Sequence, residues 1–393
     1  MSARPLDGIT IVDLSRLLPG PLCTLHLADL GAEVIKIEQP GDGDYTRAIP
    51  PLTKNISTFF LTVNRNKRSV TLDLGKEEGR EVLLKMVEKA HVVVESFRPG
   101  ALDKMNLSYE VLAKRNPAII LCSITGYGQT GPYKSKAGHD LNYLAYAGIL
   151  RPTLGGGGNP AIPNFQIGDI VGGTQNAVMA ILAAIIYQTS TGKGQHLDVS
   201  MLDGLLAHNV VALAQKESVS SIGMDTSDIL SGLLHCYNLY KTKDGKYIAL
   251  GALEFKFWAK FCQSINRDDL VSKHMVMGEE SEHVVAELSV IFASKTRDEW
   301  TDVLDGADCC ISPVNTMAEA LEDPQVQHRR LVKVHEHSAE GAVTYFDLPF
   351  KSTALAAPEN TQAPLLGEHT EEILKRLGYD QQSIEALKES GAI

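Results

Sequence analysis

The sequence predicts an α/β fold, in which helices cover a parallel sheet, together with a second, smaller lobe. Apolar, β-branched stretches alternate with helical stretches through the first third of the chain, as in parallel strands joined by crossover helices. From about Ser200 to Arg330 this alternation gives way to a more charged stretch. The chain has 393 residues, whereas one domain holds roughly 100–200, so two lobes are expected.

The predicted elements are bounded by ordinary helix and strand signals. We expect strands at 9–14, 33–38, 70–74, 91–97, 118–124 and, in the later lobe, 246–250. Helices are expected at 21–30, where Gly31 ends the helix, and at 77–89, 175–188 and 367–377. The four consecutive glycines at 155–158 predict a mobile loop, because glycine has no side chain to restrict it or to pack.

The composition disfavours several classes of protein. A net charge of −11 disfavours a nucleic-acid binder, which usually presents a basic face. No run of about 18 apolar residues occurs, so we expect no membrane span, and the N-terminus lacks a signal pattern, so we expect a cytoplasmic protein. The six cysteines form no C-x-x-C pair, which favours free thiols and no metal site. The loop at 15–21 lacks G-x-G-x-x-G, so NAD binding is not expected.

Two residues, His139 and Asp169, are candidates for proton transfer or nucleophilic attack. His139 follows a glycine-rich turn at 126–132, and loops after strands are where α/β proteins place their sites. Its imidazole can take or give a proton near neutral pH, although a histidine that caps a helix or pairs with Asp140 explains the pattern as well. Asp169 precedes a long apolar helix, whose N-terminus should favour the ionised carboxylate; an N-capping aspartate beside packing glycines is the alternative.

Acidic and basic residues elsewhere indicate supporting roles. Glu254 opens a helix, where it either complements the helix dipole or orients a catalytic partner. The basic residues of segment 64–68 and Arg98 lie at edges of the predicted sheet, and ammonium and guanidinium groups suit phosphates. Solvated turns are the alternative for both. No G-x-S-x-G, H-E-x-x-H or paired-cysteine redox motif is present.

Ordered matches along almost the whole chain resemble one protein family. They begin at Pro5-Leu6-Asp7-Gly8-Ile9, end at 363–370, and include the segments 27–34, 64–69, 97–100, 126–132 and 191–195. In these segments the sequence is similar to the class III CoA-transferase family, also called CaiB/BaiF. The segments around His139 (137–144) and before Glu254 (251–254) resemble the α-methylacyl-CoA racemase branch of that family. Gln39 departs from both branches, which commonly carry an arginine there.

The resemblance implies a fold and a set of site residues. It implies a large Rossmann-like domain formed by 1–200 and 330–393, a small domain formed by 201–329, and an interlocked, ring-like homodimer. The implied catalytic residues are His139, Asp169 and Glu254. The implied acyl-CoA-binding residues are Lys67, Arg68, Asp73, Leu74, Phe97, Arg98, Ala137, Gly138, Asp140 and Asn142. Coenzyme A enters only as part of the substrate, and no other cofactor and no metal is expected.

The resemblance is compatible with three functions for this protein: two different reactions, and binding of CoA without catalysis. In a racemase, which we favour because only this reaction gives His139 and Glu254 a role, His139 and Asp169 exchange the proton on the carbon next to the thioester through an enolate, and Glu254 orients His139. In a CoA-transferase, Asp169 attacks the thioester, and an acyl–aspartyl anhydride and then aspartyl-CoA carry the group between carboxylic acids. A subunit that only binds CoA is the third alternative. Two-base transfer requires His139 and Asp169 to flank one acyl site.

Overall fold

The structure is a computed structural model that describes residues 4–150, 161–222, 229–355 and 360–393. The chain divides into two compact units. The large unit is formed by Met1–Ala147, Pro163–His208 and His328–Ile393, and the small unit by Asn209–Gln327 with Gly148–Ile162. The large unit therefore draws on both ends of the chain. The glycines at 155–158, predicted to form a mobile loop, lie outside the described residues.

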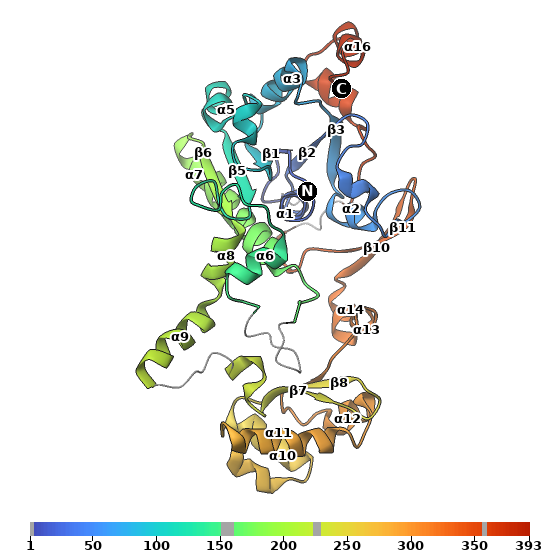
Figure 1. Ribbon diagram of the computed structural model, residues 1–393. Helices are drawn as coiled ribbons and strands as arrows, with labels where there is room; N and C mark the ends of the chain where they lie inside the picture. Colours follow the sequence, from blue (N-terminus) through green and yellow to red (C-terminus); the bar gives the residue numbers. More distant parts are fainter. Residues whose placement is uncertain (1–3, 151–160, 223–228, 356–359) are drawn as a thin grey trace. The chain divides into compact units, whose positions relative to one another are not determined.

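The large unit is built on a six-stranded sheet in which every neighbouring pair of strands is parallel (Figure 1). Its strands are β1 (Thr10–Asp13), β2 (Glu33–Glu38), β3 (Lys67–Thr71), β4 (Val92–Glu95), β5 (Ile120–Thr125) and β6 (Gln195–Ser200). The strand order is β3-β2-β1-β4-β5-β6, so the winding reverses between β1 and β4. Ligands of such sheets bind outside the carboxyl ends of the strands at this reversal. The residues that follow Asp13 and Glu95 therefore mark the expected site.

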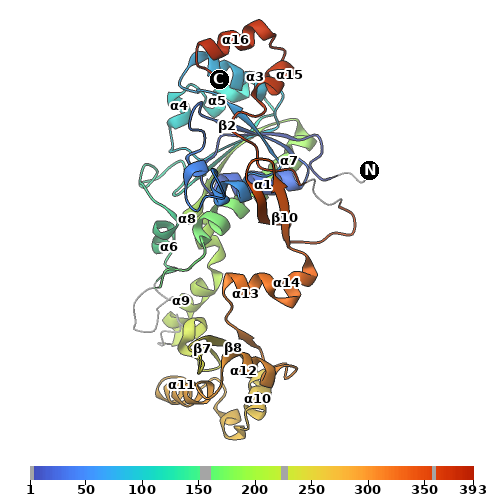
Figure 2. The same cartoon turned by 90° about the vertical axis from the view of Figure 1, so that its right-hand side faces the viewer.

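Helices cover both faces of this sheet (Figures 1 and 2). The strand residues Val12 and Ile35 belong to one apolar core, whereas their buried neighbours Ile11 and Val34 point to the opposite face because side chains alternate along a strand. The first core includes residues of α3 (Glu77–Val87), α4 (Ala101–Lys104), α5 (Tyr109–Arg115), α15 (Thr370–Arg376) and α16 (Gln381–Glu389). The helices α1 (Pro19–Asp29) and α7 (Asn176–Thr191) contact the strands on the opposite face of the sheet, toward which Ile11 and Val34 point.

Shorter elements complete the large unit. The hairpin of β10 (Val332–His337) and β11 (Gly341–Phe346) packs on α2 (Thr58–Val63), where Phe60 and Val343 share a small apolar cluster. The remaining helices are η1 (Tyr45–Ala48), α6 (Asp140–Tyr146), η2 (Gly168–Gln175) and α8 (Met201–His208). α14 (Pro324–Arg329) spans the boundary between the two units.

η2 and α7 form one continuous helix of 24 residues, Gly168–Thr191. It begins at Gly168 rather than at Gln175, because glycines allow its first turns to pack tightly: a Cβ on Gly172 would lie 2.4 Å from the carbonyl oxygen of Met201. By length and composition this helix could cross a membrane, a test that core helices of soluble proteins also pass. One side of α7, including Ala177 and Ile181, is buried.

The end of the chain completes the core of the large unit. Ile373 and Leu374 in α15 and Ile384 in α16 are buried in the same apolar core as α3, beside which both helices lie in the two views (Figures 1 and 2). The backbone N–H of Asp73 donates to the carbonyl oxygen of Ala392 over 2.8 Å. The sheet therefore depends on residues more than 300 positions apart in the sequence.

The small unit has its own sheet and core. Its three antiparallel strands, in the order β7-β8-β9, are β7 (Tyr237–Lys241), β8 (Tyr247–Gly251) and β9 (Ile311–Pro313). Trp258, Phe261, Phe292 and Trp300 form the centre of its apolar core. Its helices are α9 (Val210–Ile222), η3 (Ile229–Leu233), α10 (Phe255–Ser264), η4 (Asp268–Lys273), α11 (Glu279–Phe292), α12 (Arg297–Leu304) and α13 (Met317–Glu322).

Candidate active site

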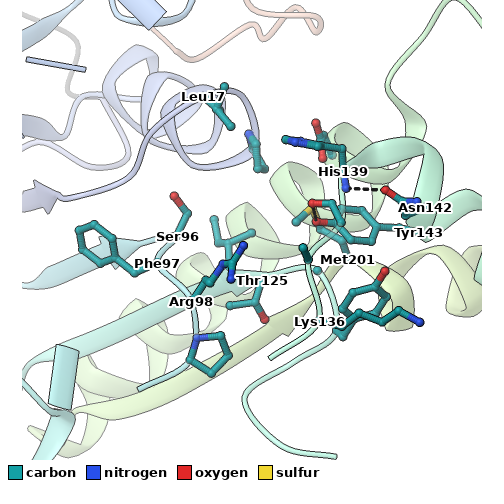
Figure 3. A pocket seen from close by; sticks show the side chains of 18 of the residues that line it. Leu17, Ser96, Phe97, Arg98, Thr125, Lys136, His139, Asn142, Tyr143 and Met201 are labelled. Carbon is teal, nitrogen blue, oxygen red and sulfur yellow. Dashed lines mark hydrogen bonds between the residues drawn. The ribbon is translucent and has the colours of Figure 1, made fainter. Parts of the chain in front are cut away.

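A pocket of about 440 Å³ lies in the large unit where the winding of the sheet reverses (Figure 3). In Figure 3, Ser96, Phe97 and Arg98, which follow β4, lie opposite His139 and the side chains of α6. The pocket is lined by Arg16, Leu17, Pro19, Ser96, Phe97, Arg98, Pro99, Ile124, Thr125, Gly126, Tyr127, Lys134, Lys136, Ala137, Gly138, His139, Asn142, Tyr143, Asp169 and Met201. The two candidate reacting residues, His139 and Asp169, thus line the same pocket.

Asp169 is the second residue of η2, which has π-helical hydrogen bonding. Such wide turns are rare and are often found at functional sites. The backbone N–H of Asp169 donates to Oδ1 of Asp140 over 3.0 Å, which ties the start of η2 to the start of α6. Gly168 allows this approach, because a Cβ there would lie 2.9 Å from Oδ1 of Asp140. The predicted aspartate therefore stands at a junction of two helices rather than before a regular α-helix.

Burial raises the pKa of Asp169 to about 7, with a further contribution from the carboxylate of Asp140. The sequence predicted the opposite, since a helix N-terminus favours an ionised carboxylate. In the structure the loss of water around the carboxyl group and the repulsion by Asp140 raise the pKa instead. A carboxylate of raised pKa is more basic and more poorly solvated than an ordinary aspartate, as a nucleophile or a proton acceptor requires.

His139 is the N-cap residue of α6 and is exposed to the pocket. Its backbone N–H donates to the side-chain oxygen of Asn142 over 3.0 Å (Figure 3). The hydroxyl of Tyr143 donates to the carbonyl oxygen of Gly138 over 2.6 Å, which fixes the preceding backbone. His139 therefore occupies the N-cap position that the sequence left open as an alternative, and it also lines the pocket.

Four basic residues line the pocket: Arg16, Arg98, Lys134 and Lys136. In the described parts of the chain none of them forms an ion pair with a carboxylate, although other surface cations such as Arg68 do. Among the described residues that line the pocket, Asp169 is the single acidic one. A pocket with four unneutralised cations attracts anionic groups, phosphates and carboxylates above all.

A cluster of tyrosines forms the wall around Lys136. The Lys136 ammonium lies 4.7 Å from the ring centre of Tyr133 and 4.6 Å from that of Tyr146, and it also hydrogen bonds the Tyr146 hydroxyl. The ring of Tyr127 packs edge-on against Tyr143 at 5.2 Å. The hydroxyl of Tyr127 is buried and has no hydrogen-bond partner among residues that the structure describes. Within the described chain it is therefore an unpaired donor buried in the wall of the pocket.

The predicted CoA-binding residues fall into two groups. Phe97, Arg98, Ala137, Gly138 and Asn142 line the pocket. Asp140 does not, but it bonds the backbone of Asp169.

Lys67, Arg68, Asp73 and Leu74 lie elsewhere. Lys67 is not free to meet a phosphate, because its ammonium is fully buried and bonds Asp13 at 3.1 Å. Arg68 pairs with Glu33 and Glu372, and Leu74 is part of the apolar core of the large unit. Asp73 accepts a hydrogen bond from the backbone of Gly75, which shapes a turn.

Glu254 belongs to the small unit. It is the N-cap residue of α10, makes no side-chain cap and is exposed. It is not part of the pocket lining. The alternative that the sequence left open, an acid that complements a helix N-terminus, accords with this position.

The sequence interpretation missed Arg16, Leu17, Tyr127, Lys134 and Lys136. The first two follow β1 directly, and the rule that ligands bind beyond the strands at the reversal of winding identifies such a loop once the strand order is known. The two lysines lie between the glycine-rich turn and His139, where a pair of basic residues was a usable signal. No signal in the sequence singled out Tyr127.

Comparison with known proteins gives a family. The sequence model described as CoA-transferase family III matches residues 6–370. The chain is 36% identical over 403 residues to a succinyl-CoA:glutarate CoA-transferase from Mus musculus, covering 100% of this chain and 91% of that protein. It is 33% identical over 385 residues to an alpha-methylacyl-CoA racemase from Homo sapiens, covering 97% and 96%. A crystal structure of a CAIB/BAIF family protein from Brucella suis matches with a TM-score of 0.81 at 31% identity and covers 95% of this chain and 100% of that one. The chain belongs to CoA-transferase family III, and it is an enzyme of that family, which uses CoA thioesters as substrates.

Proposed function

We propose that the protein is a CoA-transferase that moves coenzyme A between two carboxylic acids, with Asp169 as the group that carries the acyl unit. One observation supports this most directly: Asp169 is the single carboxyl group in a pocket lined by four basic residues that have no carboxylate partner in the described chain. Such a pocket suits both the phosphates of CoA and the carboxylate of an acid substrate. Similarity to a succinyl-CoA:glutarate CoA-transferase at 36% identity also favours transfer.

The raised pKa of Asp169 fits the role of a nucleophile. Near neutral pH a pKa of about 7 leaves a large share of the carboxyl groups ionised, and each ionised group is poorly solvated. Binding an acyl-CoA among the four cations brings its thioester carbonyl into this pocket. The nucleophile and the electrophile then react as neighbours rather than as partners in solution.

The proposed reaction has four balanced steps. A carboxylate oxygen of Asp169 attacks the thioester carbonyl carbon, the C–S bond breaks, CoA leaves as a thiolate, and an acyl–aspartyl anhydride remains. The thiolate attacks the aspartyl carbonyl, releasing the first acid as a carboxylate and leaving aspartyl-CoA. The second acid attacks that thioester, expelling the thiolate and forming a second anhydride. The thiolate then attacks the new acyl carbonyl, giving the product thioester and free Asp169.

Tyr127 is suited to assist these steps. Each attack places negative charge on a carbonyl oxygen, and a preorganised donor at that oxygen lowers the barrier. The backbone N–H groups of Asp169 and Ile170 already donate to Asp140 and to the carbonyl of Gln166, so they are occupied. The unpartnered hydroxyl of Tyr127 is therefore the donor that we assign to the developing oxyanion.

A racemase is the second candidate, and His139 favours it. His139 and Asp169 line one pocket, as two groups that pass a proton across one carbon must. The alpha-methylacyl-CoA racemase relative is 33% identical, close to the value for the transferase. In a transferase, His139 has no covalent role and serves the acceptor acid or the thioester as a binding residue.

An isotope experiment separates the two reactions. The protein is incubated with succinyl-CoA and glutarate that carries ¹⁸O in its carboxyl groups, and the peptide that contains Asp169 is then examined by mass spectrometry. Each turnover through Asp169 installs one heavy oxygen on that residue, because the bridging oxygen of the second anhydride comes from the acceptor acid. Glutaryl-CoA should form, and both signals should vanish in Asp169→Asn.

The control reaction is solvent exchange without an acid. A 2-methylacyl-CoA in D₂O should keep its α-proton signal in NMR if the protein is a transferase, and transfer should survive in His139→Gln. Exchange of the α-proton that is lost in His139→Gln, with no heavy oxygen on Asp169, would overturn the transferase proposal in favour of the racemase.

We also propose that the protein works as a homodimer. The face of α7 that does not pack on the sheet exposes Met179, Ile186 and Tyr187, at 63%, 72% and 46% of their surface. Their spacing places them on one side of the helix, and clustered apolar groups of this kind mark association surfaces. Light scattering should give twice the chain mass of 42.7 kDa, and Ile186→Lys should lower it.

A further inference from the structure

Glu95, the last residue of β4, carries a buried carboxyl group directly before the turn that lines the pocket. Only 3% of its surface is exposed. Its Oε2 accepts a hydrogen bond from the backbone N–H of Phe97 over 2.6 Å. A short bond of this kind to an ionised acceptor is about twice as strong as a bond between neutral groups. The carboxyl group of Glu95 is thus bonded to the middle of the Ser96–Pro99 turn.

That turn is held at three further points, two of which involve Arg16, a residue that also lines the pocket. The backbone N–H of Arg16 donates to the Ser96 hydroxyl over 3.2 Å, and the Arg16 guanidinium lies 5.7 Å from the ring centre of Phe97. The N–H of Ala101 donates to the carbonyl oxygen of Arg98 over 3.0 Å. The bond from Glu95 is the one contact in this set that involves a buried ionisable group.

Glu95 also faces a second, smaller cavity of about 260 Å³. Arg98 and Pro99 line both this cavity and the large pocket, so the turn forms the wall between the two. The carboxyl group of Glu95 thus lies on one side of the wall, and the substrate pocket lies on the other. It does not line the substrate pocket itself.

Polar groups on the neighbouring strands surround the carboxyl group. The Ser123 hydroxyl on β5 lowers the pKa of this carboxyl group, and the carboxylate of Asp198 on β6 raises it by repelling its charge. The Ser123 hydroxyl also lies 2.9 Å from Nε2 of His196, whose ring stacks on Tyr109. The other titratable or charged groups that face Glu95 or its cavity are Cys122 on β5 and, around the cavity, Arg98, Asp103 and Glu110.

We propose that Glu95 is a positioning residue for substrate binding: its carboxylate, by accepting the Phe97 amide, holds the Ser96–Pro99 turn so that Phe97 and Arg98 face the acyl-CoA pocket. The inference rests on the proposed function, because it assumes that this pocket takes a CoA thioester. Glu95 does not touch the substrate and acts only through the turn. Its loss should therefore raise KM and the dissociation constant of CoA while leaving kcat within about twofold.

The arrangement makes the turn sensitive to pH. Burial raises the pKa of Glu95 to about 7, and the charge of Asp198 raises it as well, against the Ser123 and Phe97 hydrogen bonds that lower it. Above this pH the ionised carboxylate accepts the Phe97 amide strongly. Below it the protonated group is a weaker acceptor, so CoA affinity should fall by about three- to tenfold between pH 8 and pH 6.

The test measures CoA binding where Asp169 cannot titrate. Coenzyme A is titrated calorimetrically into Asp169→Asn and into the same protein with Glu95→Gln, at pH 6, 7 and 8. Glu95→Gln keeps the shape and an acceptor oxygen but removes the charge. We expect the single variant to lose affinity as the pH falls and the double variant to bind about three- to tenfold more weakly at pH 8 with a flatter pH profile.

A matched control and a second readout separate the possible failures. Glu110→Gln makes the same change in the same small cavity, where Glu110 accepts from the Ser108 hydroxyl, and it should leave the CoA profile unchanged. Amide hydrogen exchange at Phe97 should be faster in Glu95→Gln than in the unsubstituted chain at one pH. Equal exchange at Phe97, or an unchanged pH profile of CoA binding, would overturn the inference alone. No binding of CoA to the unsubstituted protein would overturn the proposed function and the inference with it.

Discussion

Replacing Asp169 by asparagine should make the large unit more stable at neutral pH while abolishing transfer. The pKa of this carboxyl group rises from an ordinary 3.8 to about 7 on folding. At 1.36 kcal/mol for each pKa unit, the folded state is destabilised by up to about 4 kcal/mol once the group is ionised. An asparagine side chain would keep the size of the aspartate and avoid this cost.

The sign of the pH dependence follows from the direction of the shift. Below about pH 4 the group is protonated in both states, so folding carries no cost from it. Between about pH 4 and 7 the folded state keeps a proton that the unfolded state has lost, and stability falls as the pH rises. Above about pH 7 the full cost is present. The stability gained by Asp169→Asn should therefore grow by about 2–3 kcal/mol between pH 5 and pH 8.

The assay can follow the two units separately. The chain has two tryptophans, Trp258 and Trp300, and both lie in the core of the small unit. Thermal unfolding of the large unit is followed by hydrogen exchange of β4 and β5 amides, and that of the small unit by tryptophan fluorescence. At pH 8 the melting temperature of the large unit should rise by roughly 5–10 °C in Asp169→Asn. The tryptophan transition should not move.

The control is Asp42→Asn, which removes the same charge at an exposed site. It should change neither transition by more than about 0.5 kcal/mol. If Asp169→Asn stabilises the large unit equally at pH 5 and pH 8, the carboxyl group is not held at a raised pKa. A desolvated nucleophile at this position would then be refuted, whatever the effect on activity.

Four further changes test the packing of the site and the core. Gly168→Ala should cut kcat about tenfold with little loss of stability, because its Cβ would displace the movable carboxylate of Asp140, 2.9 Å away. Gly172→Ala should destabilise the large unit by about 1–3 kcal/mol, because its Cβ would lie 2.4 Å from a backbone oxygen of α8. Equal melting temperatures in the two variants would contradict this difference. Tyr127→Phe should lower kcat about 100-fold at unchanged CoA affinity, as measured by steady-state kinetics, and a change below twofold would remove Tyr127 from the reaction. Removing residues 380–393 should unfold the large unit at 37 °C, seen as loss of slow hydrogen exchange in the sheet, while tryptophan fluorescence stays native.

The sequence predicted those parts of the fold whose signals are local. β2 lies at Glu33–Glu38 as predicted, because a run of apolar, β-branched residues there is bounded by Gly31. β3 begins at Lys67 rather than at Val70, since the burial of Lys67 depends on an ion pair with Asp13, 54 positions earlier, and on bonds to Pro21 and Asn64. β6 (Gln195–Ser200) was missed because its polar residues give no strand pattern, and only pairing with β5 defines it.

In the site, too, the sequence predicted what has a local signal and not what depends on contacts with distant residues. His139 and Asp169 were found because each has a chemically competent side chain at a boundary between elements. Their environment could not be predicted, since the raised pKa of Asp169 depends on burial by packing and on Asp140. Arg16 became a candidate only when the strand order placed the end of β1 beside the end of β4. A local pattern identifies reactive groups, whereas their neighbours and their protonation follow from contacts distant in sequence.

The closing of the large unit by α15 and α16 has a consequence for how the protein is made. Ile384 and the carbonyl of Ala392 complete the core, so a ribosome must release nearly the whole chain before the sheet can reach its final form. The small unit is encoded almost entirely by Asn209–Gln327, and all of its strands have emerged well before that point. Domains usually fold in the order of synthesis, N-terminal first. Here the order should be inverted. The small unit should fold during translation, and the strands synthesised first should reach their final packing only after the last helix has been made.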